Sequence, residues 1–147
     1  MWQSLQNLLK NIRAYPELSP DMGLRYRVKR WLRSRPDLTV EQWYLQCWQS
    51  PQGGFSVSKR LIQFLHTHLE KHTGLDAGRI RPSDRLIEDL KFPLICWFDW
   101  PIALCDDVYT EFNVDIVDRF DESQLSTVEE LARFLDAEIA AADSIPS

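Results

Sequence analysis

The chain has 147 residues, of which 44% are hydrophobic and 27% charged, as in folded globular proteins rather than disordered ones. A chain of this length buries roughly two-thirds of its unfolded surface, so it needs neither disulfides nor a metal to hold a core. No apolar run approaches the roughly 20 residues that span a bilayer, and the first residues lack the pattern of a secretory signal. The three cysteines, Cys47, Cys96 and Cys105, have no ligand-like spacing, so we expect reduced thiols in a cytoplasmic protein.

The charge is divided unevenly along the chain. Residues 1–50 carry eight Lys or Arg and four Asp or Glu, whereas residues 51–147 carry nine and eighteen, which gives net charges of +4 and −9. Such a division is typical of two structural units with different partners, or of two units that face each other. The turn-rich segment Ser50–Gly54 is the best boundary between them. We therefore expect a basic helical extension over residues 1–50 and an acidic helical domain over residues 55–140.

Three short helices are expected before this boundary. Helical spacing of leucines predicts one at about residues 3–14, which Pro16 ends. Ser19-Pro20-Asp21 is typical of the start of a second, which runs to about residue 35 with an apolar stripe of Leu24, Val28, Trp31 and Leu32. Thr39 and Gln42 form a capping box for the third, whose buried face comprises Val40, Trp43, Tyr44, Cys47 and Trp48.

The acidic part also has helical periodicity. A long helix is predicted at about residues 56–72 and is closed by Gly74, which enters a left-handed cap without steric cost. A structured loop follows over residues 75–90. A helix at about residues 99–112 tolerates Pro101 in its first turn, and a last helix is capped by Ser126 with Glu129 or by Thr127 with Glu130. The predicted fold class is all-α.

The order of these elements in residues 55–140 resembles that of acyl carrier proteins. The matching pieces are Glu88-Asp89-Leu90 after the long loop, Glu111-Phe112 at a helix end, extended Val114-Asp115-Ile116, and Ser126-Thr127-Val128 opening the last helix. The chain looks most like divergent, uncharacterised bacterial carrier-like domains. This resemblance implies an acyl-carrier-like four-helix bundle, to which the chain adds an N-terminal three-helix extension.

The chain departs from the carrier pattern at the attachment site of the prosthetic arm. A carrier needs a serine at the start of its second helix, and the usual spacing back from Phe112 lands on Trp97-Phe98-Asp99. Neither Ser83 nor Ser123 starts that helix, and Ser126 is better explained as a cap. We therefore expect no cofactor and a non-catalytic protein-interaction or adaptor module. The alternative is a carrier or accessory protein of fatty-acid or polyketide metabolism that is modified at an unorthodox serine.

Two surfaces are candidates for binding. The cluster around residues 96–100 is interpreted as core filling by Trp97 and Phe98 with Asp99 as a helix cap, but tryptophan is also enriched in interfaces. The candidate partner-binding residues are Trp97, Trp100, Asp106, Asp107 and Glu111. A basic face of the second helix comprises Arg25, Arg27, Lys29, Arg30 and Arg33. This face is typical of a solvated helix, with docking to the acidic half, to an unknown protein or to nucleic-acid phosphates as alternatives. The isoelectric point near 5.2 counts against nucleic acid.

The histidines raise the question of a metal. His68 and His72 lie one helical turn apart, but there is no HExxH motif and no evident third ligand. The pattern favours one histidine that points into the core and two that are solvated. His66 is one of the two solvated histidines. No motif of a catalytic thiol, nucleophile elbow or phosphate-binding loop occurs, so the sequence does not predict an enzyme.

Overall fold

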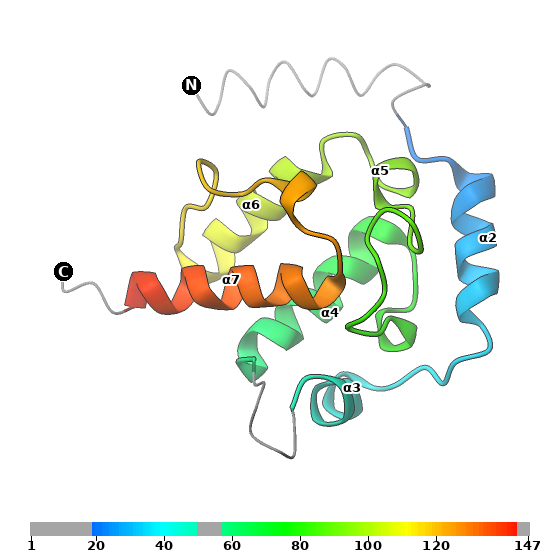
Figure 1. Cartoon of the computed structure of the whole chain (residues 1–147), viewed down its shortest axis with the longest axis horizontal. Helices are drawn as coiled ribbons and strands as arrows, with labels where there is room; N and C mark the ends of the chain where they lie inside the picture. Colours follow the sequence, from blue (N-terminus) through cyan, green and yellow to red (C-terminus); the bar gives the residue numbers. More distant parts are fainter. Residues whose placement is uncertain (1–18, 50–56, 144–147) are drawn as a thin grey trace.

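The computed structural model describes residues 19–49 and 57–143, and these residues form six α-helices, two short 3-10 turns and no β-strand (Figure 1). An isolated bridge joins Arg85 and Thr127. The expected all-α class is confirmed. The helix predicted at residues 3–14 and the boundary Ser50–Gly54 lie outside the described residues.

Helices α2 (Met22–Leu32) and α3 (Val40–Cys47) form close to the predicted positions. The capping residue of α2 is Asp21 rather than Ser19, because the Asp21 carboxylate accepts a hydrogen bond from the amide of Leu24 at 3.0 Å. The helix also ends before the expected residue 35. Thr39 and Gln42 form the predicted capping box of α3, with both reciprocal hydrogen bonds present.

Helix α4 (Lys59–Thr73) is the centre of the fold and packs against α3, α6, α7 and the 3-10 turn η2 (Ala77–Arg79). Ser58 caps its first turn, and Gly74 ends it with a left-handed φ of 72°. This is the predicted C-terminal cap. The amphipathic pattern explains the central position, because the inner side of α4 is buried at Leu61, Ile62, Leu65, His68, Leu69 and Thr73.

Three further helices complete the structure, namely α5 (Phe92–Ile95), α6 (Trp100–Phe112) and α7 (Val128–Asp143), with the turn η3 (Glu122–Gln124) before α7. The one-turn helix α5 was not predicted. Of the two alternatives for α7, the structure selects Thr127 with Glu130, since the Thr127 hydroxyl accepts from the Glu130 amide at 3.1 Å. Asp99 occupies the N-cap position of α6, but its side chain makes no capping hydrogen bond, contrary to expectation.

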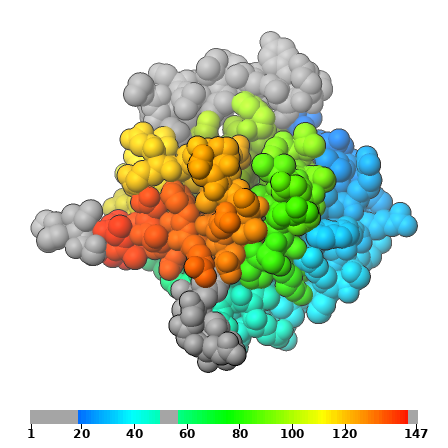
Figure 2. Space-filling model, in the orientation of Figure 1, coloured from blue at the N-terminus to red at the C-terminus, as the bar shows by residue number. Residues whose placement is uncertain are grey.

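One hydrophobic core includes residues from both the basic and the acidic part of the sequence. Val28, Leu32, Trp43 and Trp48 belong to the same buried cluster as the inner residues of α4, α6 and α7. In the space-filling view the surface of α2 and α3 adjoins that of residues 75–91 (Figure 2). Trp31 is the exception to the predicted stripe of α2. It is 48% exposed and lies under the Arg35 guanidinium, whose carbon is 4.7 Å from the ring centroid.

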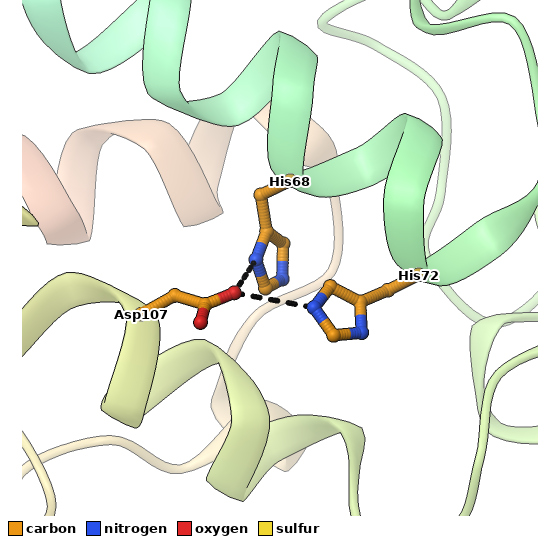
Figure 3. A group of neighbouring side chains, drawn as sticks. All are labelled: His68, His72 and Asp107. Carbon is orange, nitrogen blue, oxygen red and sulfur yellow. Dashed lines mark hydrogen bonds and ion pairs between the residues drawn. The ribbon is translucent and has the colours of Figure 1, made fainter. Parts of the chain in front are cut away.

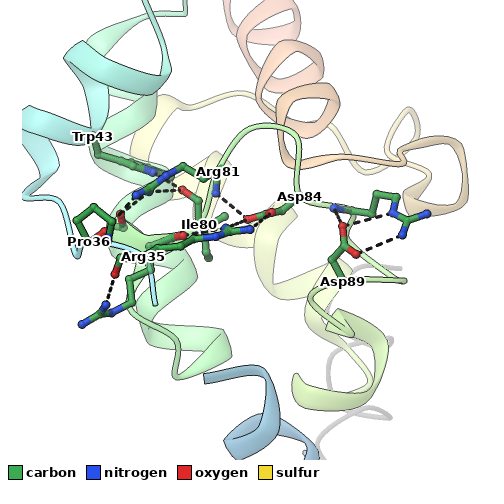
Figure 4. Close-up of polar contacts among 10 residues, drawn as sticks. Arg35, Pro36, Trp43, Ile80, Arg81, Asp84 and Asp89 are labelled. Carbon is green, nitrogen blue, oxygen red and sulfur yellow. Dashed lines mark hydrogen bonds and ion pairs between the residues drawn. The ribbon is translucent and has the colours of Figure 1, made fainter. Parts of the chain in front are cut away.

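Polar contacts join the same two parts (Figure 4). The Trp43 indole donates to the Ile80 carbonyl at 2.7 Å, and the Arg81 guanidinium donates to the Pro36 carbonyl at 3.1 Å. The backbones meet directly where the amide of Leu38 donates to the carbonyl of Gly78. A β-carbon at residue 78 would lie 2.0 Å from the Leu38 carbonyl oxygen, so only glycine fits this close approach.

Candidate functional site between helices α4 and α6

A groove of about 380 Å³ lies between α4 and α6. Helix α4 contributes basic, polar and aromatic side chains, and α6 contributes acidic and hydroxyl groups. The lining residues are Arg60, Gln63, Phe64, Thr67, His68, Lys71, Asp107, Thr110 and Glu111. Apart from the buried His68, the amphipathic patterns of the two helices place these residues outside the core, so the groove is a consequence of how α4 packs on α6.

Two histidines of α4 converge on one carboxylate of α6 beside this groove (Figure 3). His68 Nδ1 lies 2.8 Å from Asp107 Oδ2, and His72 Nε2 lies 3.1 Å from the same oxygen. The two imidazole rings are one helical turn apart, with their centroids separated by 4.3 Å. We call His68, His72 and Asp107 the histidine–aspartate cluster.

The tautomer of His68 follows from its second nitrogen. The Trp100 indole N–H, which is only a donor, points at His68 Nε2 across 3.1 Å. His68 Nε2 therefore accepts, and in the neutral ring the proton lies on Nδ1, which donates to Asp107. The His68 side chain is 1% exposed, so its ring is shielded from water, whereas Asp107 at the other end of this hydrogen-bonded chain is 31% exposed.

The protonation of the cluster at neutral pH follows from its surroundings. The hydrogen bond from His68, aided by His72, lowers the pKa of Asp107 below its usual value, so this group is a carboxylate. Burial and the neighbouring His68 lower the pKa of His72, although Asp107 opposes this effect. His72 is therefore mainly neutral at pH 7, and the cluster carries a single negative charge when His68 is neutral as well.

The histidine prediction is correct for one residue only. His68 is the expected inward histidine, but His66 and His72 are not solvated, since their side chains are 16% and 19% exposed. His66 instead packs edge-on against the Trp43 ring at 5.3 Å between centroids. Sequence reasoning missed Asp107 as the partner of His68 and His72, because no local pattern relates residues of α4 to residues of α6 across the intervening loop.

Of the candidate partner-binding residues, Asp107 and Glu111 line the groove together, whereas Trp100 lies in the core. Asp106 and Glu111 are exposed on α6, and Glu111 pairs with Arg60 across the groove at 3.6 Å. Asp107 is held in the histidine–aspartate cluster. Trp100 is 4% exposed and packs in the core, so it is unsuitable as a docking residue.

The aromatic residues near the start of α6 differ in burial from what the sequence predicts. Trp97 is 36% exposed and Phe98 is half-buried, whereas Trp100 packs edge-on against Phe92 inside the core. The interpretation that Trp97 and Phe98 fill the core is therefore wrong for Trp97. Ser83, Ser123 and Ser126 are all exposed, and none of them lies at the start of α6.

The basic face of α2 keeps four of its five predicted residues, because Arg27, Lys29, Arg30 and Arg33 are exposed. Arg25 turns inward and was wrongly assigned to this face. Its Nη2 donates to the Ile95 carbonyl at 2.6 Å, and its side chain lies against Gly74. Arg25 thus attaches α2 to α5 and to the end of α4.

No family model, curated protein or solved structure matches the chain. Within the described ranges, no helix has the length and apolar character needed to cross a membrane.

Proposed function

We propose that the chain is a non-catalytic protein-interaction module that binds a partner through the groove between α4 and α6. The amino-acid composition of this groove is the main support for the proposal. Arg60, Lys71 and the aromatic ring of Phe64 line the groove from α4, and Asp107 and Glu111 line it from α6. Arginine and aromatic side chains inside a polar rim are characteristic of protein interfaces.

The exposed side of α6 extends this surface beyond the groove. Tyr109 is 54% exposed, and Asp106 and Thr110 are exposed beside it. An amphipathic tyrosine next to carboxylates suits a protein segment that brings basic side chains to α6. In the carrier-like order of elements α6 is the second helix, and the missing serine supports a role in which docking has replaced transport of an arm.

Site-specific photo-crosslinking tests this proposal. A benzophenone amino acid is placed at Thr110 in the full-length chain, with Asp118 in the loop before α7 as the control position, and crosslinked proteins are identified by mass spectrometry. The critical comparison is the double charge reversal Asp106→Lys and Glu111→Lys against the matched reversal of two exposed acids elsewhere, Asp118→Lys and Glu88→Lys.

We expect a partner that crosslinks from position 110. Its crosslinking should be lost in the Asp106→Lys and Glu111→Lys variant and should persist in the matched Asp118→Lys and Glu88→Lys variant. Equal capture with all variants, or capture from position 118 alone, would remove the basis for docking on α6. The proposed loss of the arm has a separate test. Co-expression with a phosphopantetheinyl transferase should leave the intact mass unchanged, whereas a gain near the mass of the arm would favour the carrier alternative.

A further inference from the structure

We propose that His68, His72 and Asp107 form a binding site for a divalent transition-metal ion of the zinc class. The inference does not depend on the proposed interaction role. It rests on three donor atoms, which are His68 Nδ1, His72 Nε2 and a carboxylate oxygen of Asp107, all within 4.8 Å of one another. Figure 3 shows both rings directed at the same carboxylate from adjacent turns of α4.

The spacing of these atoms suits a small ion. Zinc binds imidazole nitrogen and carboxylate oxygen at about 2.0–2.2 Å, so tetrahedral ligand atoms stand roughly 3.3–3.5 Å apart. The two nitrogens now lie 2.8 and 3.1 Å from Asp107 Oδ2. Each nitrogen therefore needs to move only about half an ångström away from the carboxylate oxygen, and the two nitrogens, which lie within 4.8 Å of each other, need to end at the same tetrahedral spacing.

The donor set is chemically appropriate as well. Two imidazoles and one carboxylate give a borderline site that favours zinc over magnesium or calcium, and three protein ligands leave a fourth position for water. Asp107 is 31% exposed, and both it and His68 line the groove, which gives an ion a path of entry. Within the cluster, the charge of Asp107 favours a cation.

Other charged groups near the site modulate its affinity. Lys71 is close enough to His72 to disfavour a positive charge there, and Arg60 lies farther along the groove. On the acidic side, Glu111 pairs with Arg60 and offsets its charge, while Glu70 interacts with His66 rather than with the cluster. The site is therefore not electrostatically optimised, and moderate affinity is expected.

Trp100 is the main element that opposes metal binding. Its indole N–H keeps His68 Nε2 unprotonated and holds the proton on Nδ1, which is the nitrogen that would bind the ion. Binding requires that the neutral ring move its proton to Nε2, which then faces the Trp100 donor. The neutral His72 must also carry its proton on Nδ1, so both rings change tautomer without net proton release.

This opposition provides a sharp test, because removal of the indole N–H should strengthen binding. Zinc chloride is titrated calorimetrically into the full-length, metal-free protein in a Cys47→Ser background, which removes the half-buried thiol as a competing ligand. We expect saturable 1:1 binding. His72→Ala and Asp107→Asn should each weaken zinc binding at least tenfold. Trp100→Phe should tighten it about tenfold, because the indole N–H would no longer face the N–H that His68 Nε2 carries when the metal is bound. His66→Ala is the matched control, since it lies on the same helix outside the cluster and should leave the affinity unchanged.

Cobalt(II) provides the spectroscopic readout, as its visible absorption reports coordination by these ligands directly. His68 itself is left intact because it is buried, and circular dichroism confirms that each variant is folded. If zinc binds neither the parent protein nor Trp100→Phe, the three side chains only hydrogen-bond to one another and the proposal fails. Binding that is insensitive to His72→Ala and Asp107→Asn, or equally sensitive to His66→Ala, would likewise overturn it.

Discussion

Arg35 and Asp84 form a bidentate ion pair that joins the end of α2 to the loop before α5. Arg35 Nη1 donates to Oδ2 at 2.6 Å and Nη2 donates to Oδ1 at 2.9 Å. Asp84 is 4% exposed, and its carboxylate also accepts the backbone amide of Arg81 at 2.7 Å. Arg35 belongs to the basic part of the sequence and Asp84 to the acidic part, so the pair ties α2 to the loop that follows η2.

Arg35→Ala should destabilise the protein by about 3 kcal/mol, because it leaves the buried Asp84 carboxylate without its charged partner. The measurement is urea unfolding followed by circular dichroism. Arg33→Ala, an exposed arginine of the same segment, is the control and should change the unfolding free energy by less than about 0.5 kcal/mol. A loss of similar size in both variants would show that Asp84 is not the cause.

Two tryptophans on neighbouring helices make a second matched pair. Trp43 is 0% exposed and donates to the Ile80 carbonyl, whereas Trp31 is 48% exposed. Trp43→Ala should cost about 3–5 kcal/mol through lost burial and a residual cavity. Trp31→Ala should cost less than about 1 kcal/mol, mostly through its contact with Arg35. Thermal and denaturant melts check both values, and equal losses would contradict the placement of Trp43 in the core.

The glycines give a prediction about backbone contact. Gly78→Ala should destabilise the protein by more than 2 kcal/mol, because its β-carbon would collide with the Leu38 backbone, which has no flexible end to move aside. Gly23→Ala should instead be neutral or stabilising by up to about 1 kcal/mol. Residue 23 lies in α2, and a β-carbon there meets its nearest atom, Asp21 Oδ1, at 3.5 Å. Unfolding midpoints that move in the same direction for both variants would argue against the close approach at Gly78.

Local signals predicted two of the helix caps correctly. The Thr39–Gln42 capping box and the Gly74 cap need only neighbouring residues, so the sequence contains all the information that determines them. The helix α5 could not be predicted in this way. It spans one turn, includes Pro93 and follows Lys91, whose φ of 59° is unusual for a residue other than glycine. Tertiary packing decides such a segment rather than propensity.

The candidate site shows the limit of sequence reasoning more clearly. The periodicity of α4 and α6 was evident, but not the rotation and register of one helix against the other. For that reason Asp107 was interpreted as a surface acid, and Trp100 was grouped with the exposed residues. The contact of Asp107 with His68 depends on packing between residues 39 positions apart, which no local motif encodes.

The buried thiols give a prediction for alkaline conditions. Burial raises the pKa of Cys96 to about 12 and that of Cys105 to about 11, from the ordinary value of 9.0. Between pH 9 and 11 the unfolded chain therefore releases thiol protons that the folded chain retains, so the unfolding free energy should fall as pH rises. Below pH 8 these thiols should not make the unfolding free energy depend on pH.

Iodoacetamide labelling with peptide mass spectrometry checks the same groups individually. At pH 8, Cys96 and Cys105 should remain unmodified in the folded protein and react fully in urea. Cys47 is half-buried, and burial raises its pKa more modestly, so it should react at an intermediate rate. Rapid labelling of Cys96 in the native state would mean that the segment between α5 and α6 opens readily, because its sulfur cannot otherwise meet the reagent as a thiolate.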